Sequence, residues 1–288
     1  MIFVTLEIIR ADFRETLNRC NGKASLVFCS PPYGKQRKKK DLYGEGFTRE
    51  DYFDLGKYAA KAITHDGNFI CNIGDPMDPT TNAQDLLHVL CCEEFSRSLR
   101  VQQVLIWQKN GYPGTFLYSL RQDHEYLVWC NLQRGSKMHP ERLITGSDRK
   151  TKPWLNSYYD KSCKKISSKK IVKSELFLEG KKLPGSVFCH KIGVSGRYVT
   201  DTAGHPATFP LSLAEDMVNC FSDSGDLVCD PFVGSGTTAV AAVALGRSFI
   251  GGDLHENGEG VSWSDVAIRN IRKMVLPENN GKGLEVYL

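Results

Sequence analysis

Residues 226–254, DLVCDPFVGSGTTAVAAVALGRSFIGGDL, constrain the fold more than any other part of the chain. An apolar strand runs into Asp230, and Gly234 and Gly236 follow within the next six residues. A helix rich in small side chains comes next, and a second apolar strand ends at Asp253. Glycines at such a turn let the backbone approach a ligand closely, and the helix N-terminus offers free N–H groups. The segment therefore predicts a nucleotide-type β-turn-α-β unit.

Two ligand classes compete for this turn. Gly234, Gly236 and Ala239 match the dinucleotide pattern G-x-G-x-x-A, whereas the Walker pattern fails because no lysine follows the glycines. Asp230 would repel a pyrophosphate but would hold an ammonium group, and Asp253 suits ribose hydroxyls. S-adenosylmethionine carries an ammonium and a sulfonium. The residues favour that cofactor, and leave open a nicotinamide dinucleotide or a tight turn without a ligand.

The rest of the chain alternates short apolar runs with helix-like stretches, which is typical of a parallel α/β sheet. We expect about seven strands, at residues 1–9, 24–30, 67–74, 100–109, 124–132, 226–232 and 247–254. Helices are expected at residues 49–63, 82–99, 211–222 and 236–246. The pattern predicts one doubly wound α/β domain.

Residues 135–185 interrupt this alternation. They hold 13 Lys and Arg against 5 Asp and Glu, together with several aromatic residues, and predict an insertion on the α/β body. A second basic cluster, KQRKKK, begins at Lys35. Localised positive charge suggests a polyanionic partner, although a solvated surface or a partly disordered segment would have the same composition. The candidate phosphate contacts are Lys35, Arg37, Lys38, Lys39, Lys164, Lys165, Lys169 and Lys170.

Several functional classes are disfavoured. No apolar run reaches the ~18 residues of a membrane span, and residues 1–13 lack the basic start and cleavage site of a signal peptide. The 10 cysteines include no C-x-x-C pair, so we expect reduced, buried thiols and no metal site. An intracellular protein is expected, in the cytoplasm or nucleoid of a bacterium or the nucleus of a eukaryote.

The strand expected at residues 24–30 ends in Ser30-Pro31-Pro32-Tyr33. Proline cannot donate to a sheet ladder, so this sequence is at least a turn. The two prolines also make a stiff loop without N–H donors. Its carbonyl groups, its hydroxyl and its aromatic ring suit a flat substrate.

Three motifs together resemble the β class of S-adenosylmethionine-dependent DNA amino-methyltransferases. Residues 230–238, DPFVGSGTT, look like the cofactor motif of that family, and residues 30–33, SPPY, look like its catalytic motif. Residues 205–210, HPATFP, are similar to the segment that precedes the cofactor strand. The order of catalytic loop, basic region and cofactor motif is the circularly permuted order of that class.

The resemblance implies a Rossmann-like methyltransferase sheet and a division of the chain into three parts. Residues 1–134 would form the catalytic half, residues 135–185 the target-recognition insertion, and residues 186–288 the cofactor-binding half. The implied cofactor-binding residues are Asp12, His205, Pro206, Asp230, Pro231, Phe232, Gly234, Ser235, Gly236, Thr237, Thr238 and Asp253. Asp12 would lie near the adenine, and helix N-capping is the alternative role for it.

The resemblance also implies the reaction. A base flipped out of double-stranded DNA would receive the methyl group directly, without a covalent enzyme intermediate and without a metal. The Ser30 hydroxyl and Pro31 carbonyl would accept the two amino hydrogens, Pro32 would stiffen the loop, and Tyr33 would stack on the base. In this family SPPY is associated mainly with N4 of cytosine and DPPY with N6 of adenine. The sequence leaves the oligomeric state open, a homodimer included.

Overall fold

The computed structural model describes ten stretches of the chain. They are residues 4–33, 47–76, 83–110, 122–143, 155–159, 165–170, 184–191, 208–254, 260–274 and 284–287. The chain divides into two compact units. One unit, called the body here, comprises residues 1–138 and 186–288, and the other comprises residues 139–185.

A nine-stranded sheet runs through the body in the order β11-β1-β10-β9-β2-β3-β5-β4-β8. The strands are β1 (Val4–Ile9), β2 (Ala24–Cys29), β3 (Ile63–Ile73), β4 (Arg100–Asn110), β5 (His124–Asn131), β8 (Val187–Lys191), β9 (Leu227–Asp230), β10 (Ser248–Gly252) and β11 (Leu284–Tyr287). All seven predicted strands are present. The α/β Rossmann-like class is therefore confirmed.

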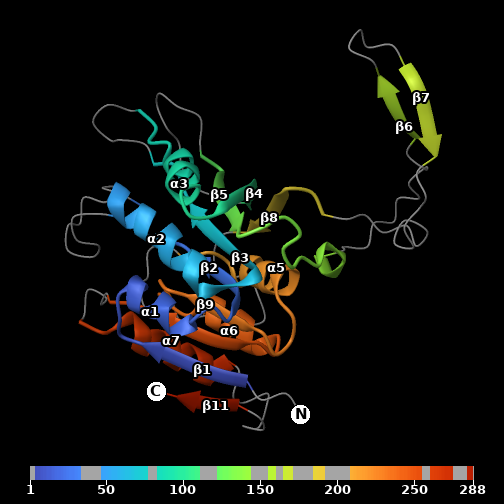
Figure 1. Cartoon of the computed structure of the whole chain (residues 1–288). Helices are drawn as coiled ribbons and strands as arrows, with labels where there is room; N and C mark the ends of the chain where they lie inside the picture. Colours follow the sequence, from blue (N-terminus) through green and yellow to red (C-terminus); the bar gives the residue numbers. More distant parts are fainter. Residues whose placement is uncertain are drawn as a thin grey trace. The chain divides into compact units, whose positions relative to one another are not determined.

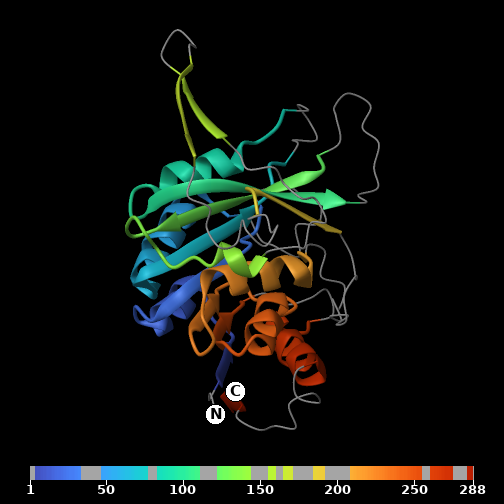
Figure 2. The same ribbon diagram turned by 90° about the vertical axis from the view of Figure 1, so that its right-hand side faces the viewer.

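Helices cover both faces of this sheet (Figures 1 and 2). They are α1 (Phe13–Cys20), α2 (Arg49–Ala62), α3 (Leu87–Phe95), α5 (Leu211–Phe221), α6 (Thr237–Ala244) and α7 (Trp263–Met274). The blue to teal helices α1, α2 and α3 pack in a row on one face. The orange to red helices α5, α6 and α7 lie in front of the sheet in Figure 2, on the other face. The sheet is doubly wound, as predicted.

Two expectations about the sheet are wrong. It has nine strands rather than about seven, because the short runs β8 and β11 extend its two edges. It is also mixed rather than parallel: β5 is antiparallel to both of its neighbours, β3 and β4. An apolar run gives no strand direction. Two parallel strands are usually connected by a crossover helix. The sequence of residues 111–123, between β4 and β5, has no helical pattern, and this was a usable sign of an antiparallel pair.

The face under α1, α2 and α3 shows why the central strands are almost wholly apolar. All six residues of β2 are buried. Phe69 of β3 and Phe95 of α3 meet edge to face with ring centroids 5.0 Å apart. Gly56 in the middle of α2 lets this ring approach, because a Cβ there would lie 2.9 Å from Phe95 Cδ1. A glycine inside a helix here exchanges helix propensity for close packing.

The sheet opens a crevice where β2 and β9 lie side by side. These two strands are parallel neighbours, with Val27 opposite Cys229. The helices that follow them, α2 and α6, cover opposite faces of the sheet (Figures 1 and 2). Where neighbouring strands send their chains to opposite faces, a ligand crevice forms at their carboxyl ends. Residues 30–33 and the glycine turn begin at these two ends.

The unit of residues 139–185 contains a 3₁₀ turn, η1 (Pro140–Leu143), and a two-stranded antiparallel sheet. That sheet pairs β6 (Leu155–Tyr159) with β7 (Lys165–Lys170). The predicted insertion at 135–185 covers this unit, and its role in target recognition stays a prediction.

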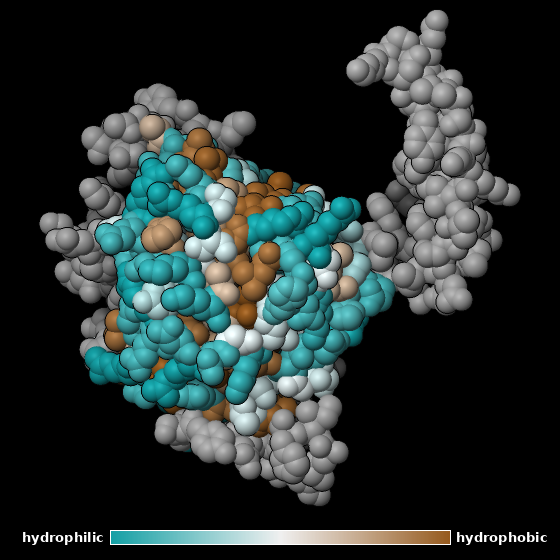
Figure 3. Space-filling view, in the orientation of Figure 1, coloured by the Kyte–Doolittle hydropathy of each residue, from teal (hydrophilic) through white to brown (hydrophobic). Residues whose placement is uncertain are grey.

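Hydrophilic side chains cover most of the described surface in Figure 3, with hydrophobic side chains between them. Among the described residues, no helix has both the length and the apolar character needed to cross a membrane. Within the same residues, no cluster of three or more His, Cys, Asp or Glu side chains could hold a metal ion. Nine cysteines in the described stretches are free thiols, and seven of them are buried.

Candidate active site

Asp230 is the internal brace of the glycine turn that follows β9. Its Oδ1 accepts a hydrogen bond from the backbone N–H of Phe232 at 3.0 Å, and its Oδ2 accepts one from the Thr238 hydroxyl at 2.6 Å. The N–H of Gly236 donates to the carbonyl of Val233 at 2.8 Å. The side chain is 2% exposed, so this carboxyl joins the end of β9 to the first turn of α6 from inside the protein.

Burial raises the pKa of Asp230 to about 7, because the charged form loses its hydration. The hydrogen bonds from Thr238 and from the Phe232 N–H oppose this rise, and the nearby Asp253 carboxylate adds to it. The carboxyl therefore changes its charge near neutral pH. A cation bound beside it would favour the ionised form.

Gly236 occupies a position that only glycine fits. Its φ is +89°, in the left-handed region, and a Cβ there would lie 3.0 Å from both Cα and Cβ of Ala267 in α7. The same helix holds the turn through Asn270, whose Nδ2 donates to the Ser235 carbonyl at 2.8 Å. Close approach between the turn and α7 therefore depends on the missing side chain.

Asp253 joins three strand ends at the crevice. Its Oδ2 accepts a hydrogen bond from the Gly234 N–H at 3.0 Å, and its own N–H donates to the Ile9 carbonyl at 3.3 Å. The side chain is 7% exposed. The end of β10 thus fixes the glycine turn after β9 and lies against the end of β1.

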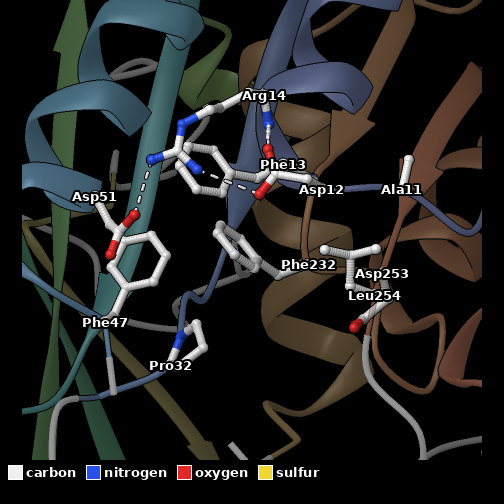
Figure 4. A pocket seen from close by; sticks show the side chains of 11 residues that line it. Ala11, Asp12, Phe13, Arg14, Pro32, Phe47, Asp51, Phe232, Asp253 and Leu254 are labelled. Carbon is white, nitrogen blue, oxygen red and sulfur yellow. Dashed lines mark hydrogen bonds and ion pairs between the residues drawn. The ribbon is translucent and has the colours of Figure 1, made fainter. Parts of the chain in front are cut away.

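The start of α1 supplies the next part of the site. Asp12 is the N-cap and accepts a hydrogen bond from the Arg14 N–H at 2.8 Å, so the capping role is present. The Arg14 guanidinium pairs with Asp12 at 3.3 Å and with Asp51 of α2 at 2.8 Å (Figure 4). It also pairs with Asp54 of α2 at 2.8 Å. One cation thereby holds α1, α2 and the end of β1 together.

A cavity lies between these elements, at the carboxyl ends of β1, β2, β9 and β10 (Figure 4). Phe232 of the glycine turn stacks on Phe13 with centroids 5.5 Å apart and meets Phe47 edge to face at 5.5 Å. The cavity therefore has an aromatic wall and several carboxylates at its edge. Its lining consists of Ala11, Asp12, Phe13, Arg14, Pro32, Phe47, Asp51, Pro231, Phe232, Asp253 and Leu254.

The loop of residues 30–33 reaches this cavity through Pro32. The Pro32 carbonyl accepts a hydrogen bond from the Tyr52 hydroxyl of α2 at 3.2 Å, and Pro31 is buried. Gly74, just after β3, leaves room for the Tyr33 ring, since a Cβ there would lie 3.1 Å from Tyr33 Cε2. The loop is thus held from α2 on one side and from β3 on the other.

A polar cluster surrounds the hydroxyl groups of this loop. The Tyr33 hydroxyl lies 2.9 Å from Ser30 Oγ and donates to Glu125 Oε2 at 3.0 Å. Asn72 Nδ2 donates to Glu125 Oε2 at 2.7 Å and to Tyr33 Oη at 2.9 Å. Lys109 pairs with the other carboxylate oxygen, Glu125 Oε1. Four strand ends, from β2, β3, β4 and β5, contribute to this cluster.

The predicted site residues divide into three groups. Those that line the cavity are Asp12, Pro32, Pro231, Phe232 and Asp253. Those that support it from the catalytic loop or the glycine turn are Ser30, Pro31, Tyr33, Asp230, Gly234, Ser235, Gly236, Thr237 and Thr238. His205, Pro206, Lys35, Arg37, Lys38, Lys39 and Lys164 lie outside the described residues, while Lys165, Lys169 and Lys170 belong to β7.

Sequence reasoning missed the polar cluster and the arginine. Asn72, Lys109 and Glu125 each interrupt or end an apolar strand, which was a usable signal, since a polar residue there needs a partner. Their partners could not be paired from the sequence, because Tyr33 and Glu125 are 92 positions apart. Arg14 lies two positions after the predicted N-cap, Asp12, but nothing in the sequence indicated its partners in α2.

Comparison with known proteins places the chain among DNA methylases. The family model N6_N4_Mtase, described as DNA methylase, matches residues 24–259. The chain is 28% identical over 241 residues to the Type II methyltransferase M.MthZI of Methanothermobacter thermautotrophicus, covering 75% of this chain and 61% of that protein. It is also 37% identical over 79 residues to the orphan methyltransferase M.BamHII of Bacillus amyloliquefaciens, covering 27% of this chain and 28% of that protein.

Solved structures share the fold over nearly the whole chain. The PvuII DNA methyltransferase (cytosine-N4-specific) superposes with a TM-score of 0.63 at 19% identity, covering 99% of this chain and 96% of that one. A putative DNA modification methylase from Thermus thermophilus, complexed with S-adenosyl-L-methionine, gives a TM-score of 0.58 at 21% identity. That match covers 97% of each chain. At these identities the likeness establishes the architecture.

Proposed function

The chain belongs to the DNA methylase family, and from that premise we propose that it transfers a methyl group from S-adenosylmethionine to an amino group of a DNA base. We propose further that the acceptor is N4 of cytosine, at a specific site in double-stranded DNA. The observation that carries this proposal is one cavity. It is lined by Pro32 of the catalytic loop together with Phe232 of the cofactor motif and Asp253 at the end of β10.

The residues around the cavity suit the proposed cofactor. Asp12, Asp51 and Asp253 place three carboxylates at its edge against the single guanidinium of Arg14. An excess of negative charge opposes a pyrophosphate and favours a cationic ligand. The aromatic wall suits a flat adenine ring. When bound, S-adenosylmethionine would supply an activated methyl group on its sulfonium.

The catalytic loop would orient the acceptor. An exocyclic amino group is a weak nucleophile, because its lone pair is delocalised into the ring. Acceptors at Ser30 Oγ and at the Pro31 carbonyl would bind its two hydrogens and direct the lone pair toward the methyl group. The stiff loop would hold this geometry, and positioning would supply most of the rate. A base can reach the loop only after it has been flipped out of the duplex.

The choice of cytosine is supported by Ser30 at the first position of the motif and by the fold shared with a cytosine-N4-specific enzyme. The alternative is N6 of adenine on the same fold, since the name of the matched family model includes both amino groups. Both amino groups lie on Watson–Crick edges, so base flipping does not distinguish them.

The basic insertion would contact the DNA. Residues 135–185 carry the largest local excess of positive charge in the chain, and phosphate neutralisation makes binding steeply salt-dependent. Selection of the target sequence would depend on side chains of the same insertion. This division of labour leaves the body to carry cofactor and catalytic loop.

The decisive experiment is a product assay. The protein is incubated with S-adenosylmethionine and unmethylated genomic DNA, and the DNA is digested to nucleosides and compared with standards by mass spectrometry. N4-methylcytosine is the expected product. N6-methyladenine would keep the cofactor and the mechanism but overturn the base assignment.

A thermal shift separates methyl transfer from dinucleotide chemistry. S-adenosylmethionine should raise the Tm, whereas NAD should leave it unchanged. Ser30→Ala should abolish most turnover while DNA binding, measured separately, is retained. A variant with the full methylation rate would remove Ser30 from the proposed catalytic residues.

A further inference from the structure

The polar cluster at the catalytic loop has a fixed direction of hydrogen bonding, which can be followed from one end to the other. It begins at Glu125, whose carboxylate pairs with Lys109, and both side chains are 13% exposed. An ionised carboxylate can only accept hydrogen bonds. Every polar group facing Glu125 must therefore donate to it.

Two groups donate to the same carboxylate oxygen. The Tyr33 hydroxyl donates to Glu125 Oε2 at 3.0 Å, and Asn72 Nδ2 donates to it at 2.7 Å. Burial, and then the negative charge of Glu125, raise the pKa of Tyr33, so the phenol keeps its single proton at neutral pH. That proton is committed to Glu125.

The direction of the next bond follows. Ser30 Oγ and Tyr33 Oη lie 2.9 Å apart, and since the phenolic proton is committed to Glu125, the Ser30 hydroxyl must be the donor. Asn72 Nδ2 also donates to Tyr33 Oη, at 2.9 Å, and lies at a longer 3.5 Å from Ser30 Oγ. Ser30 has therefore spent its hydrogen inward and keeps acceptor capacity.

The orientation of the Asn72 amide agrees with this direction. If the amide were reversed, its oxygen would face the Glu125 carboxylate and repel it. In the orientation found, Asn72 Oδ1 is buried and has no hydrogen-bond partner within the described part of the chain. The hydroxyl and amide hydrogens of this cluster are thus engaged, while acceptor capacity is left over.

We propose that Glu125 is a positioning residue that makes Ser30 an acceptor for the amino group of the target base, acting through Tyr33. This inference rests on the proposed function, because it concerns the same loop and the same acceptor. An amino group brings two N–H donors, and a serine that donated outward would repel them. Glu125 fixes which of the two states Ser30 adopts before the base arrives.

The isosteric variant Glu125→Gln keeps the packing and tests the direction of the hydrogen bond between Ser30 and Tyr33. Lys109 can only donate, so it retains the amide oxygen on its own side. The amide nitrogen then faces Tyr33, which must accept, and Asn72, whose Nδ2 loses its acceptor. The phenolic proton turns toward Ser30. Ser30 would in turn donate outward, against the amino group. We expect a single-turnover methylation rate about 100-fold lower, similar to the loss of one fixed polar contact at a reacting group.

A second change that makes Ser30 donate to Tyr33 again should restore the methylation rate. In Lys109→Met/Glu125→Gln no ammonium holds the amide oxygen, so the amide can rotate and again accept from Tyr33. We expect this double variant to be at least tenfold faster than Glu125→Gln alone. In a Tyr33→Phe background, Glu125→Gln should have little further effect, because the connection to Ser30 is already cut.

The readouts separate positioning from a merely structural role. Cofactor affinity of Glu125→Gln should stay close to that of the wild-type protein while the rate falls. Its urea midpoint should fall as well, because the variant leaves the largely buried Lys109 ammonium without its carboxylate. If Glu125→Gln does not fold, the double variant carries the test. It buries no charge at either position and should methylate within tenfold of wild type.

Three results would overturn the inference. They are a Glu125→Gln rate above half that of wild type, a double variant no faster than Glu125→Gln, or an undiminished loss in the Tyr33→Phe background. The proposed function is judged separately in the same assay. Wild-type protein that makes no methylated base contradicts the function itself, before any variant is compared.

Discussion

The glycine turn and the catalytic loop begin at the ends of neighbouring strands, β9 and β2, but they are held in different ways. The turn is braced from within by Asp230, bound to Phe232 and Thr238, and from outside by Asp253 and Asn270, which bind its backbone. The loop is fixed by side chains from strands far along the chain, with Glu125 as the centre. The turn depends on a backbone conformation that only glycine adopts easily, so a single substitution should disrupt it. The loop is held by several separate contacts, so the loss of one contact should weaken it only in part.

The largest effect is expected at the glycine turn. Gly236→Ala forces a side chain into the left-handed region and against Ala267, at a cost of roughly 2–4 kcal/mol in the free energy of unfolding. Gly135→Ala is the matched control. Its φ is +84°, but nothing lies within 4 Å of the added Cβ, so only the backbone term of about 1–2 kcal/mol remains. Equal losses in urea unfolding would show that contact with α7 is unimportant.

Thr238→Val tests the brace itself. The valine removes the donor to Asp230 and leaves a buried carboxylate short of one bond, at a cost of roughly 1–3 kcal/mol at pH 8. The loss should shrink at pH 5, where the folded carboxyl is protonated. Thr238→Ser keeps the hydroxyl and should retain the bond. If the loss were the same at both pH values, the carboxylate charge would not be its source.

Asp230 also predicts a pH dependence. The folded pKa of about 7 lies above the unfolded value, so the stability of the free protein falls as pH rises from about 4 to 7. A cation bound beside Asp230 favours the ionised form, and S-adenosylmethionine would release a proton on binding. Its affinity should rise about tenfold from pH 6 to pH 8. Calorimetry in two buffers of different ionisation enthalpy would reveal the released proton. If no proton were released, the ammonium group of the cofactor would not bind beside Asp230.

The smallest effect is expected at the contact between α2 and the catalytic loop. Tyr52→Phe removes the hydrogen bond to the Pro32 carbonyl, which is worth about 1 kcal/mol. The contacts of Ser30 and Tyr33 remain, so the methylation rate should fall by less than about tenfold. Tyr58→Phe, on the same helix, serves as the control. If Tyr52→Phe lowered the free energy of unfolding as much as Gly236→Ala does, the catalytic loop would depend on a single contact in the same way as the glycine turn.

The same contrast explains what the sequence could and could not predict. The glycine turn was predictable because Gly234, Gly236 and Asp253 follow the strand and helix signals directly. Asp12 was predictable as a cap for the same reason. The direction of β5 was not, because apolar runs carry no direction. The partners of Tyr33 were not, because Glu125 comes from a strand whose neighbours only the folded sheet defines.

The catalytic and DNA-binding roles assigned to individual residues stay predictions, whereas the fold and the family are established. The cavity shows how the two motifs meet, which the order of motifs alone did not give. Chain order separates Pro32 from Phe232 by most of the length of the protein. The sheet order places β2 beside β9 and so joins them.

On both sides of residues 139–185, the chain is held by hydrogen bonds within the body. Lys137 donates its N–H to the Asp66 carbonyl at 2.8 Å and pairs with Asp226 at 2.7 Å, while its own carbonyl accepts from Asn68 at 2.7 Å. On the return, the Ser186 carbonyl accepts from the N–H of Ile106 at 2.8 Å. The start and the end of residues 139–185 are therefore fixed by contacts within the body, so these two points do not depend on the sequence of the insertion.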